Sequence, residues 1–507
     1  MGKMFIPLVT ASLDPPFYTH PGRMNDISSI EALEDIIPGP AKAALPRRTL
    51  SAITTPALTG KALGCASFRR VDGDDMVFAG DATKLYRAYS TVTATFTFSD
   101  VSRAAGYSTA TGETWEFVEF KAGPSGSFVI ATNFSDPVQR YVNSSRPSVS
   151  ASFANLITSS SKPKARHLGI IGQFLVLGNI NEAASATASY APSRVHWSAF
   201  GAPASFTPLA STQCDYEDLT TGGAVQKITS GTEYGLVFQE RQVQVMRYVG
   251  GTTIFDFSPM DYAPGTPVPN SVIAYGGSVY YISTEGFMAL QGLQLKRIGN
   301  DIVDKWFWTN VEQTRFYEVS ATVDPINKLI MWAFPVDTAG YAKYIYAYNF
   351  VDGRWSRWNS AIETLALIRR GTSSEKCIAF DTAHKLATFT GDVVTAAIRT
   401  NALQPVPGRR WQCNGIRMLM DHSGPPGNNP TGVTPTGTAT FLSMDSPMPA
   451  TTPTSSTAVN IRPDNYFPMR AAGRFISFSI NISPGNSGAL KTRYVGLELD
   501  YELLGDR

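Results

Sequence analysis

The sequence predicts an all-β protein, in which a β-propeller of about seven blades follows an N-terminal arm and precedes a small C-terminal β-sandwich. Two observations predict this fold class. Glycine (42) and proline (33) are abundant among the 507 residues and only 17% are charged, which favours short strands and many turns over long helices. In addition, segments made of an apolar strand, a Gly- or Asp-containing turn and a second apolar strand recur at a nearly regular interval.

Seven segments carry this strand-turn-strand pattern. With one residue early in each second strand as a marker, the successive intervals are 52, 46, 62, 43, 50 and 48 residues. Periods of about 40 to 50 residues with strand-rich units are typical of β-propeller blades, whose sheets bury both faces only by stacking round an axis. Two stacked β-sandwiches are the alternative architecture. The markers are Val77, Val129, Leu175, Val237, Tyr280, Ile330 and Ile378.

The stretch KYIYAYNFVDGRWSRWN at 343–359 is predicted to be the outer hairpin of the sixth blade. Side chains alternate between the two faces of a strand, so Tyr344, Tyr346 and Tyr348 share one face. We expect these rings to cover the neighbouring blade.

The turn of this hairpin and its second strand carry three further expectations. Asp352 and Gly353 are predicted to supply the positive φ angles of a two-residue turn. The odd spacing of Trp355 and Trp358 places them on opposite faces of a regular strand. One of the two indoles could therefore be exposed to solvent.

The segment before the first blade, residues 1–55, shows little periodicity and is predicted to be an arm. Within it, SSIEALEDIIPGP is predicted to form a short helix that starts at Ser28 or Ser29 and is ended by Pro38.

The propeller is predicted to span 56–398, and 399–507 to form the β-sandwich. Its predicted strands are CNGIRMLMD, GTATFLSMD, RFISFSINIS and RYVGLELDYELL. Between them lie two stretches rich in Pro, Thr, Ser and Gly, HSGPPGNNPTGVTPTGT and MDSPMPATTPTSSTAVN. Such stretches bury too little apolar surface to fold alone, so we expect a surface loop that either stays flexible or orders on a partner.

The formal charge of the chain is close to zero. Lys and Arg number 43 against 41 Asp and Glu, so the net charge is +2 and the electrostatic footprint of a general nucleic-acid-binding protein is missing. Three short basic clusters are predicted to be solvated faces or turn caps, with contact to DNA as the alternative. They hold Arg47 and Arg48, then Lys162, Lys164 and Arg166, and then Arg409 and Arg410.

The cysteines and histidines form no recognisable site. The four cysteines stand far apart without a Cys-x-x-Cys spacing, so we expect free buried thiols and a reducing compartment. The five histidines never occur with metal-ligand spacing, and we expect no metal and no cofactor. The residues concerned are Cys65, Cys214, Cys377, Cys413, His20, His167, His196, His384 and His422.

Catalytic motifs are likewise missing from the sequence. The nearest approach to a nucleophile elbow, GPSGS, ends in Ser127 where the motif needs glycine. A propeller glycosidase would need two carboxylates placed across a bound sugar, and sequence alone pairs none of the 41 acidic residues. We therefore expect no catalytic residues and no enzyme activity, with a sialidase-like propeller glycosidase as an alternative.

Two turn segments invite a functional interpretation. DGDD gathers Asp72, Asp74 and Asp75 at a blade turn, but the next residues are apolar where a calcium loop needs further carboxylates, so a solvated turn is favoured. STATGETW at 108–115 resembles the Asp-box hairpin of sialidase-type propellers, with Ala110 in place of the aspartate. That box is structural, so the resemblance favours a propeller fold and not hydrolysis.

An ordered series of pieces runs through residues 160–400: GLVFQE, GGSVYYISTEGF, KRIGNDI, VDPINKLIMWAFP and YNFVDGRWS. In this order they resemble the tail nozzle proteins of short-tailed bacteriophages, also called tail hub or packaged-DNA stabilisation proteins. The N-terminal AKAALPRRTLSAITTPALTGKALGCASF resembles the entry segment of that family, and MRAAGRFISFSIN resembles a strand of its C-terminal β-sandwich.

The resemblance implies a structural virion protein of the tail, made in the host cytoplasm. It implies a ring of copies, sixfold, below the portal and adaptor, which extends and helps close the DNA channel and supports DNA ejection. The implied partners are the tail adaptor or head-to-tail connector and the tail fibre, spike or needle proteins. Genomic DNA would pass without sequence-specific binding. A glycan- or peptide-binding β-propeller module is the alternative function.

A membrane-spanning segment is not expected. No stretch approaches the ~20 apolar residues that a membrane-spanning helix needs. The N-terminal MGKMFIPLVTASLD is too short and too weakly apolar for a secretory signal. We expect a protein that is soluble inside the cell that makes it.

Overall fold

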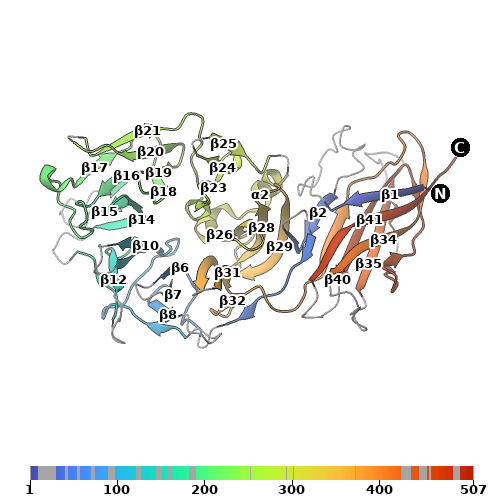
Figure 1. Ribbon diagram of the computed structural model, residues 1–507, viewed down its shortest axis with the longest axis horizontal. Coiled ribbons are helices and arrows are strands. Elements are labelled where there is room, and N and C mark those ends of the chain that lie inside the picture. Colours follow the sequence, from blue (N-terminus) through green and yellow to red (C-terminus); the bar gives the residue numbers. More distant parts are fainter. Residues whose placement is uncertain are drawn as a thin grey trace.

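The computed structural model of the chain places a ring of small sheets beside a β-sandwich (Figure 1). The structure describes residues 2–8, 30–39, 44–53, 57–69, 75–89, 97–121, 127–143, 151–157, 163–181, 190–251, 253–292, 294–300, 302–370, 373–423, 435–444, 454–455, 458–483 and 491–505.

The ring is a β-propeller of seven four-stranded antiparallel blades, as predicted. The first two blades are β6 (Gly64–Arg69), β7 (Asp75–Gly80), β8 (Leu85–Tyr89) and β9 (Ser99–Asp100), then β10 (Glu116–Lys121), β11 (Ser127–Thr132), β12 (Gln139–Asn143) and β13 (Ala154–Asn155). The third and fourth are β14 (Lys164–Ile171), β15 (Phe174–Asn181), β16 (Tyr190–Trp197) and β17 (Asp215–Asp218), then β18 (Val225–Ile228), β19 (Tyr234–Gln239), β20 (Val243–Tyr248) and β21 (Phe255–Pro259).

The remaining three blades complete the ring. The fifth and sixth are β22 (Ile273–Tyr275), β23 (Ser278–Ser283), β24 (Gly286–Gln291) and β25 (Gln294–Arg297), then β26 (Ser320–Asp324), β27 (Leu329–Phe334), β28 (Ala342–Asn349) and β29 (Trp355–Ile362). The seventh is β30 (Thr364–Arg370), β31 (Ser373–Phe380), β32 (Leu386–Thr388) and β5 (Ser51–Ala52). Short helices α2 (Asp304–Asn310), η2 (Ala210–Thr212), η3 (Pro269–Ser271) and η4 (Gln313–Glu318) lie in the connections.

The repeat read from the sequence coincides with the blades. Each of the seven marker residues lies in the second strand of its blade, and all seven are buried. Second strands are covered on both faces because alternate side chains enter the interfaces with the blades on either side. In β7, for example, Val77 and Ala79 contact the seventh blade while Met76 and Phe78 contact the second.

Seven hydrophobic clusters of the described residues lie between successive blades and close the circle. The cluster between the seventh and first blades joins Ile378 and Phe380 to Val77 and Ala79. Each four-stranded sheet is thus buried by its neighbours and not by a shared centre, which leaves the axis free for a cavity.

The C-terminal domain is a sandwich of two sheets with one apolar core between them. One sheet holds β1 (Gly2–Pro7), β3 (Ile36–Pro38), β4 (Ala44–Pro46), β34 (Trp411–Ser423), β38 (Tyr466–Phe467), β39 (Ala471–Gly473) and β41 (Lys491–Leu503). The other holds β2 (Ile30–Glu34), β33 (Ala396–Thr400), β35 (Thr436–Met444), β36 (Thr454–Ser455), β37 (Val459–Asn460) and β40 (Phe475–Ser483). The four strands predicted from the sequence correspond to β34, β35, β40 and β41.

The N-terminal segment has no sheet of its own, and its described strands belong to both domains. Strand β1 pairs with β41, β2 pairs with both β29 and β33, and β5 completes the seventh blade. Because β2 joins blade six to the sandwich, those two parts share one ten-stranded sheet (Figure 1). The helix predicted from Ser28 or Ser29 to Pro38 is wrong: apolar residues at 30, 33 and 36 face the sandwich core from β2 and β3.

The hairpin at 343–359 is the outer pair of the sixth blade, β28 and β29, as predicted. Tyr346 and Tyr348 lie against Phe287 and Tyr280 of the fifth blade, so the tyrosine face does cover a neighbour.

The turn and the tryptophans of this hairpin differ from expectation. The loop holds four residues, 350–353, because the N–H of Asn349 donates to Arg354 O, and only Gly353 has a positive φ (76°). Trp355 and Trp358 do face opposite sides, but neither is exposed.

Candidate functional site

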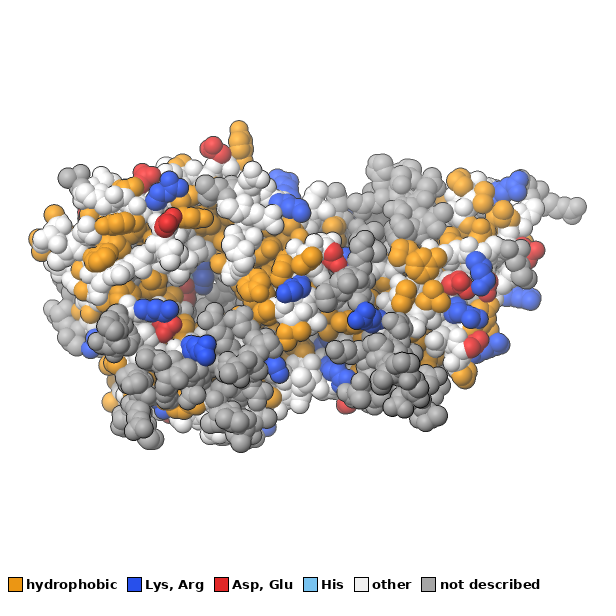
Figure 2. Space-filling view, in the orientation of Figure 1, with side chains coloured by type: hydrophobic (Ala, Val, Ile, Leu, Met, Phe, Trp, Pro, Cys, Tyr) orange, Lys and Arg blue, Asp and Glu red, His pale blue; other side chains and the backbone are white. Residues whose placement is uncertain are grey.

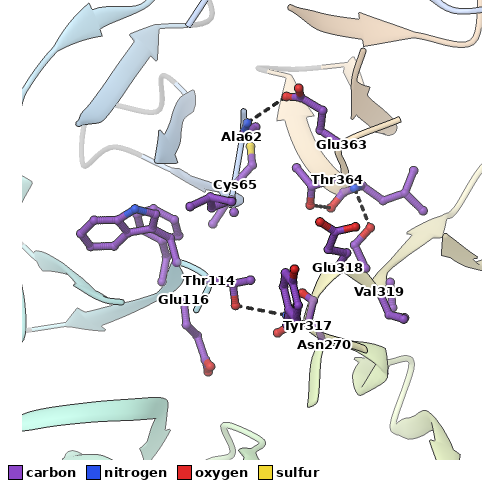
Figure 3. Close-up of a pocket in the computed structure, with 18 of the residues that line it drawn as sticks. Ala62, Cys65, Thr114, Glu116, Asn270, Tyr317, Glu318, Val319, Glu363 and Thr364 are labelled. Atoms are coloured by element: carbon purple, nitrogen blue, oxygen red, sulfur yellow. Dashed lines mark hydrogen bonds between the residues drawn. The ribbon is translucent and has the colours of Figure 1, made fainter. Parts of the chain in front are cut away.

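The innermost strands of the blades surround a cavity at one end of the propeller axis (Figure 3). Its volume is about 200 Å³. The wall comes from segments that lead into, begin or lie within the innermost strands of six blades: 61–66, 114–117, Lys227, Asn270 and Val272, 317–321, and 363–365. A propeller axis brings these segments together because every blade starts at its centre.

Glu116, the first residue of β10, ties three blades together at this wall. Its carboxylate accepts hydrogen bonds from His167 Nδ1 (3.1 Å) and the Leu168 N–H (3.2 Å), and it pairs with Lys227 Nζ at 3.1 Å. Burial raises the pKa of Glu116, but Lys227 and the two hydrogen bonds outweigh this and bring it below its ordinary 4.5. Burial lowers the pKa of His167, so a neutral imidazole donates to an ionised carboxylate.

Glu318 carries a second ion pair across the same cavity. Its Oε1 lies 2.6 Å from Lys61 Nζ and 2.5 Å from Arg315 Nη2, and Lys61 also donates to Gly340 O at 2.6 Å. The Glu318 side chain is only 6% exposed. Its Oε2 is buried and has no hydrogen-bond partner among the residues that the structure describes.

Asn270 connects opposite sides of the cavity. Its Nδ2 donates to Thr114 Oγ1 and to Tyr317 O, each at 3.2 Å, and the residues of the first bond are 156 positions apart in sequence (Figure 3). Together with the Lys61–Glu318 pair, this bond narrows the axis at this end of the propeller.

Glu363 is part of the wall and closes the ring of blades. Its Oε2 accepts from the Ala62 N–H at 2.8 Å (Figure 3). Its Oε1 is 2.5 Å from His384 Nδ1. The carboxylate is fully buried, and this burial raises its pKa. Both oxygens are used to join the seventh blade to the segment entering the first, so Glu363 has a structural role.

The cavity opens at its other end into a wider space of about 860 Å³. Residues such as Cys65, Phe117 and Leu365 line both spaces, so they form one channel along the axis. The wide part has a more apolar lining than the narrow part. It is made by the middle and far ends of the innermost strands and by the turns at 172–173 and 230–232, and it also includes Arg69, Glu119 and Lys121. Its apolar residues include Phe68, Phe117, Val118, Ile170, Ile273 and Leu367.

Comparisons with known proteins give only distant structural similarities. No protein-family model matches the sequence, and no curated protein matches it. Among solved structures, the chain is similar to Chaetomium thermophilum Raptor, with a TM-score of 0.40 and 10% identity over 69% of this chain and 30% of that one. It is also similar to the Neurospora crassa Pan2 WD40 domain (TM-score 0.38, 9% identity, 67% and 95% covered) and to BBS1N in complex with ARL6DN (TM-score 0.38, 8% identity, 68% and 97% covered). The chain therefore spans less than a third of the Raptor chain.

The basic clusters predicted from the sequence do not form one patch. Arg47 is buried and pairs with Asp35 at 2.7 Å, and Arg166 pairs with Glu113 at 2.6 Å. Figure 2 shows basic and acidic side chains scattered in small groups over one face of the molecule. Lys162 lies outside the described residues. The other members, Arg48, Lys164, Arg409 and Arg410, lie in the connection before β5, at the start of β14 and in the connection before β34.

Two of the five histidines, His167 and His384, contact the cavity carboxylates, which the sequence did not predict. His196 is buried beside Cys214. His20 and the side chain of His422 lie outside the described residues. All four cysteines are free, as predicted, and three are buried while Cys65 is partly exposed.

Two of the turn segments singled out in the sequence are only partly described by the structure. Asp75 begins β7, and Asp72 and Asp74 lie outside the described residues. Ser127 begins β11 and its hydroxyl donates to Glu119.

STATGETW connects β9 to β10, so it joins two blades and is not a hairpin within one. Its Trp115 is buried and donates from Nε1 to Asp81 O at 2.8 Å. The ring packs on Gly80, where a Cβ would lie 2.3 Å from it. The segment is therefore a structural joint between the first two blades.

The structure adds two negative findings for the part of the chain that it describes. No group of three or more His, Cys, Asp or Glu side chains there is arranged to hold a metal ion. None of the described helices has the length and apolar character to cross a membrane.

We expect Glu116→Gln to lower the free energy of unfolding by about 1–3 kcal/mol at neutral pH, because it removes a charge-assisted, buried set of bonds. The pKa of Glu116 is lower in the folded chain than its ordinary 4.5, so its contribution is present above that pH. It is lost as the pH falls through the folded-state pKa. Chemical denaturation of both proteins between pH 7 and pH 3 should show the difference shrinking with acid. A difference that is constant with pH would contradict an ionised Glu116.

Proposed function

We propose that this chain is a structural tail protein of a short-tailed bacteriophage, a tail nozzle subunit that assembles into a ring and extends the DNA channel below the portal and adaptor. The observation that carries the proposal is where the resembling pieces lie. VDPINKLIMWAFP and YNFVDGRWS form blade six, and MRAAGRFISFSIN forms β39 and β40 of the sandwich. Blade six and β40 belong to the continuous ten-stranded sheet, while β39 pairs with β34 in the other sheet of the sandwich.

A continuous sheet suits a subunit of a wall that must resist force. Domains joined only by a flexible linker move relative to one another by default. Here the sandwich is held to blade six by β2, whose Glu34 is in register with Arg357, and by the ion pair between these two side chains. A rigid two-domain unit fits a conduit for packaged DNA.

The axis of the propeller itself is an unsuitable path for DNA in this proposal. The Asn270–Thr114 bond and the Lys61–Glu318 pair cross it at one end. DNA would pass between copies in the ring, along a surface whose scattered charges bind phosphate weakly and so do not retard ejection. Its partners would be neighbouring copies and the connector and fibre, spike or needle proteins.

The experiment is to purify virions from the infection that produces this chain and to image their tails by single-particle electron microscopy. We expect a sixfold ring of this two-domain shape below the adaptor. If the protein is absent from the particles, the structural proposal falls and a glycan- or peptide-binding module takes its place.

Contacts between copies are tested best by deleting residues that belong to none of the described strands. Removing 1–27 would delete β1, and removing 423–457 would delete β35, both of which pair inside the sandwich. Deletions confined to 424–434 or 445–453, which lie outside the described residues, leave those strands in place. We propose these Pro/Thr-rich segments as contacts between copies, and copy number in purified particles is the readout.

A further inference from the structure

The channel along the propeller axis has two unlike ends. The wide part, about 860 Å³, is lined by apolar residues together with polar ones that include Arg69, Glu119 and Lys121. It leads to a narrower floor of about 200 Å³ that holds the ion pairs of Glu116 and Glu318. Ligand sites in proteins are typically concave, of some 300–1,000 Å³, and mostly apolar with a few convergent polar groups. We propose that this channel binds a neutral oligosaccharide, whose rings lie in the wide part and whose terminal hydroxyls meet the floor.

The floor offers donors and acceptors side by side with little net charge. Lys227 pairs with Glu116 and Lys61 pairs with Glu318, so each ammonium stands next to a carboxylate. A hydroxyl group both donates and accepts, and it can use the two partners of one ion pair at once. An ammonium has three protons, and Lys227 gives one of them to Glu116, so donors remain for a ligand.

One acceptor at the floor is unused. Glu318 lines the cavity, and its side chain is only 6% exposed. Its Oε2 has no hydrogen-bond partner among the described residues. A buried carboxylate oxygen without a partner is costly, so it gains more from a donated bond than an exposed one does. Because this oxygen is buried, a ligand hydroxyl reaches it only if the carboxylate or a neighbouring side chain moves.

The balance of charges selects against ions. An anion entering the floor would meet Glu116 and Glu318, and a cation would meet Lys61 and Lys227. A bare metal ion lacks a ligand cluster in the described residues. A peptide would present amides and carbonyls that each only donate or only accept, whereas neighbouring sugar hydroxyls match paired donors and acceptors.

The wide part suits sugar rings. Phe117 lines both spaces and Phe68 lines the wide one, and both rings are only partly buried. Aromatic faces pack against the C–H faces of pyranose rings, which keep their hydroxyls at the edge. Phe117 is therefore placed between the part that would hold the rings and the floor that would hold the hydroxyls.

The test uses the full chain and neutral trisaccharides of glucose, galactose, mannose and N-acetylglucosamine, with 3′-sialyllactose as the charged comparison. Saturation-transfer NMR finds which sugars bind, and calorimetry gives the affinity of the best one. We expect at least one neutral trisaccharide to bind and sialyllactose to bind at least tenfold more weakly. Binding of none of the four, or equal binding of the charged sugar, would overturn the proposal.

Two variants place the site. Lys227→Met keeps the length of the side chain and removes its donors, and it should weaken binding about tenfold or more, as expected for a lost bond to a charged group. The matched control is Lys84→Met, which removes a surface pair with Asp100 and should leave affinity unchanged. Phe117→Leu should also weaken binding, and it keeps the test open if the lysine variant fails to fold. If Lys227→Met and Phe117→Leu, both folded, bind as tightly as the parent chain, the sugar lies elsewhere and the proposal fails.

This inference is independent of the ring proposal. A chain that binds a sugar but is absent from virions would keep the site and lose the tail function. A chain that forms the tail ring and binds none of the sugars would keep the tail function and lose the sugar site.

Discussion

Replacing Trp355 with alanine is expected to lower the free energy of unfolding by about 3–5 kcal/mol, the usual cost of truncating a large buried aromatic side chain. The indole is fully buried at the start of β29. It stacks on Trp332 at 5.8 Å and meets Tyr348 at 4.7 Å and Phe287 at 5.3 Å. Its Nε1 donates to Ile298 O at 3.0 Å, so the change also leaves a buried carbonyl without that bond.

The comparison with the turn beside it makes this test specific. Asp352 pairs at 2.7 Å with Arg354, whose buried side chain also donates to Gly39 O. Asp352→Ala therefore removes one partner of a buried arginine and is expected to cost about 1–3 kcal/mol, less than the tryptophan change. Tyr262→Ala, at a side chain 97% exposed, is the aromatic control and should change nothing measurable.

Thermal and denaturant melts of the three variants decide the order. If Asp352→Ala proves worse than Trp355→Ala, the arginine it holds contributes more than the interface between blades five and six. If Tyr262→Ala matches Trp355→Ala, burial is the wrong explanation.

The blades were predictable from sequence because each is a local unit. A second strand such as β27, LIMWAF, reads as a continuous apolar run, and a turn lies only a few residues before it. The repeat interval then gives the number of blades without any long-range contact. The longest interval, 62 residues, includes the extended connection between β16 (Tyr190–Trp197) and β17 (Asp215–Asp218).

The burial of both tryptophans was not predictable in the same way. Trp358 donates from Nε1 to Ile36 O at 2.8 Å, across 322 positions of sequence. Its cover comes from β3, and nothing near 358 in the chain indicates that partner. The predicted helix at 28–38 fails for the same reason, because pairing with β33 and β29 overrides the local preference.

The cavity was missed because its parts are single residues from different blades. Glu116, Lys227 and Glu318 each look like an ordinary charge in a strand or in a connection. One signal was present: in the repeat, Glu116 begins an innermost strand, Glu318 precedes one and Lys227 lies within one, and these strands must lie at the axis. Only closure of the ring brings them to one floor, so the pairs themselves could not be assigned.

A chain that begins at residue 56 is expected to lose the cooperative unfolding of both domains. It would lack β5, the fourth strand of blade seven, and β2, the strand between blade six and the sandwich. It would also lack β1 and the apolar side chains of Ile6, Ile30 and Ile36, which are buried in the sandwich core. Strands that are missing from two sheets expose apolar faces and unpaired edges, and such surfaces aggregate.

Fragment complementation measures this effect directly. The 56–507 chain alone should elute as aggregate in size-exclusion chromatography and show no sharp thermal transition, and addition of the 1–55 peptide should restore a monomer with a sharp transition. A scrambled peptide of the same composition is the control and should restore nothing. A 56–507 chain that remains monomeric with an unchanged melt would contradict the role of the N-terminal strands. The 56–507 chain is expected not to fold on its own because it lacks the contacts that the N-terminal segment makes between the two domains. Asp35, just before β3, and Arg47, just after β4, form a buried ion pair beside Trp358.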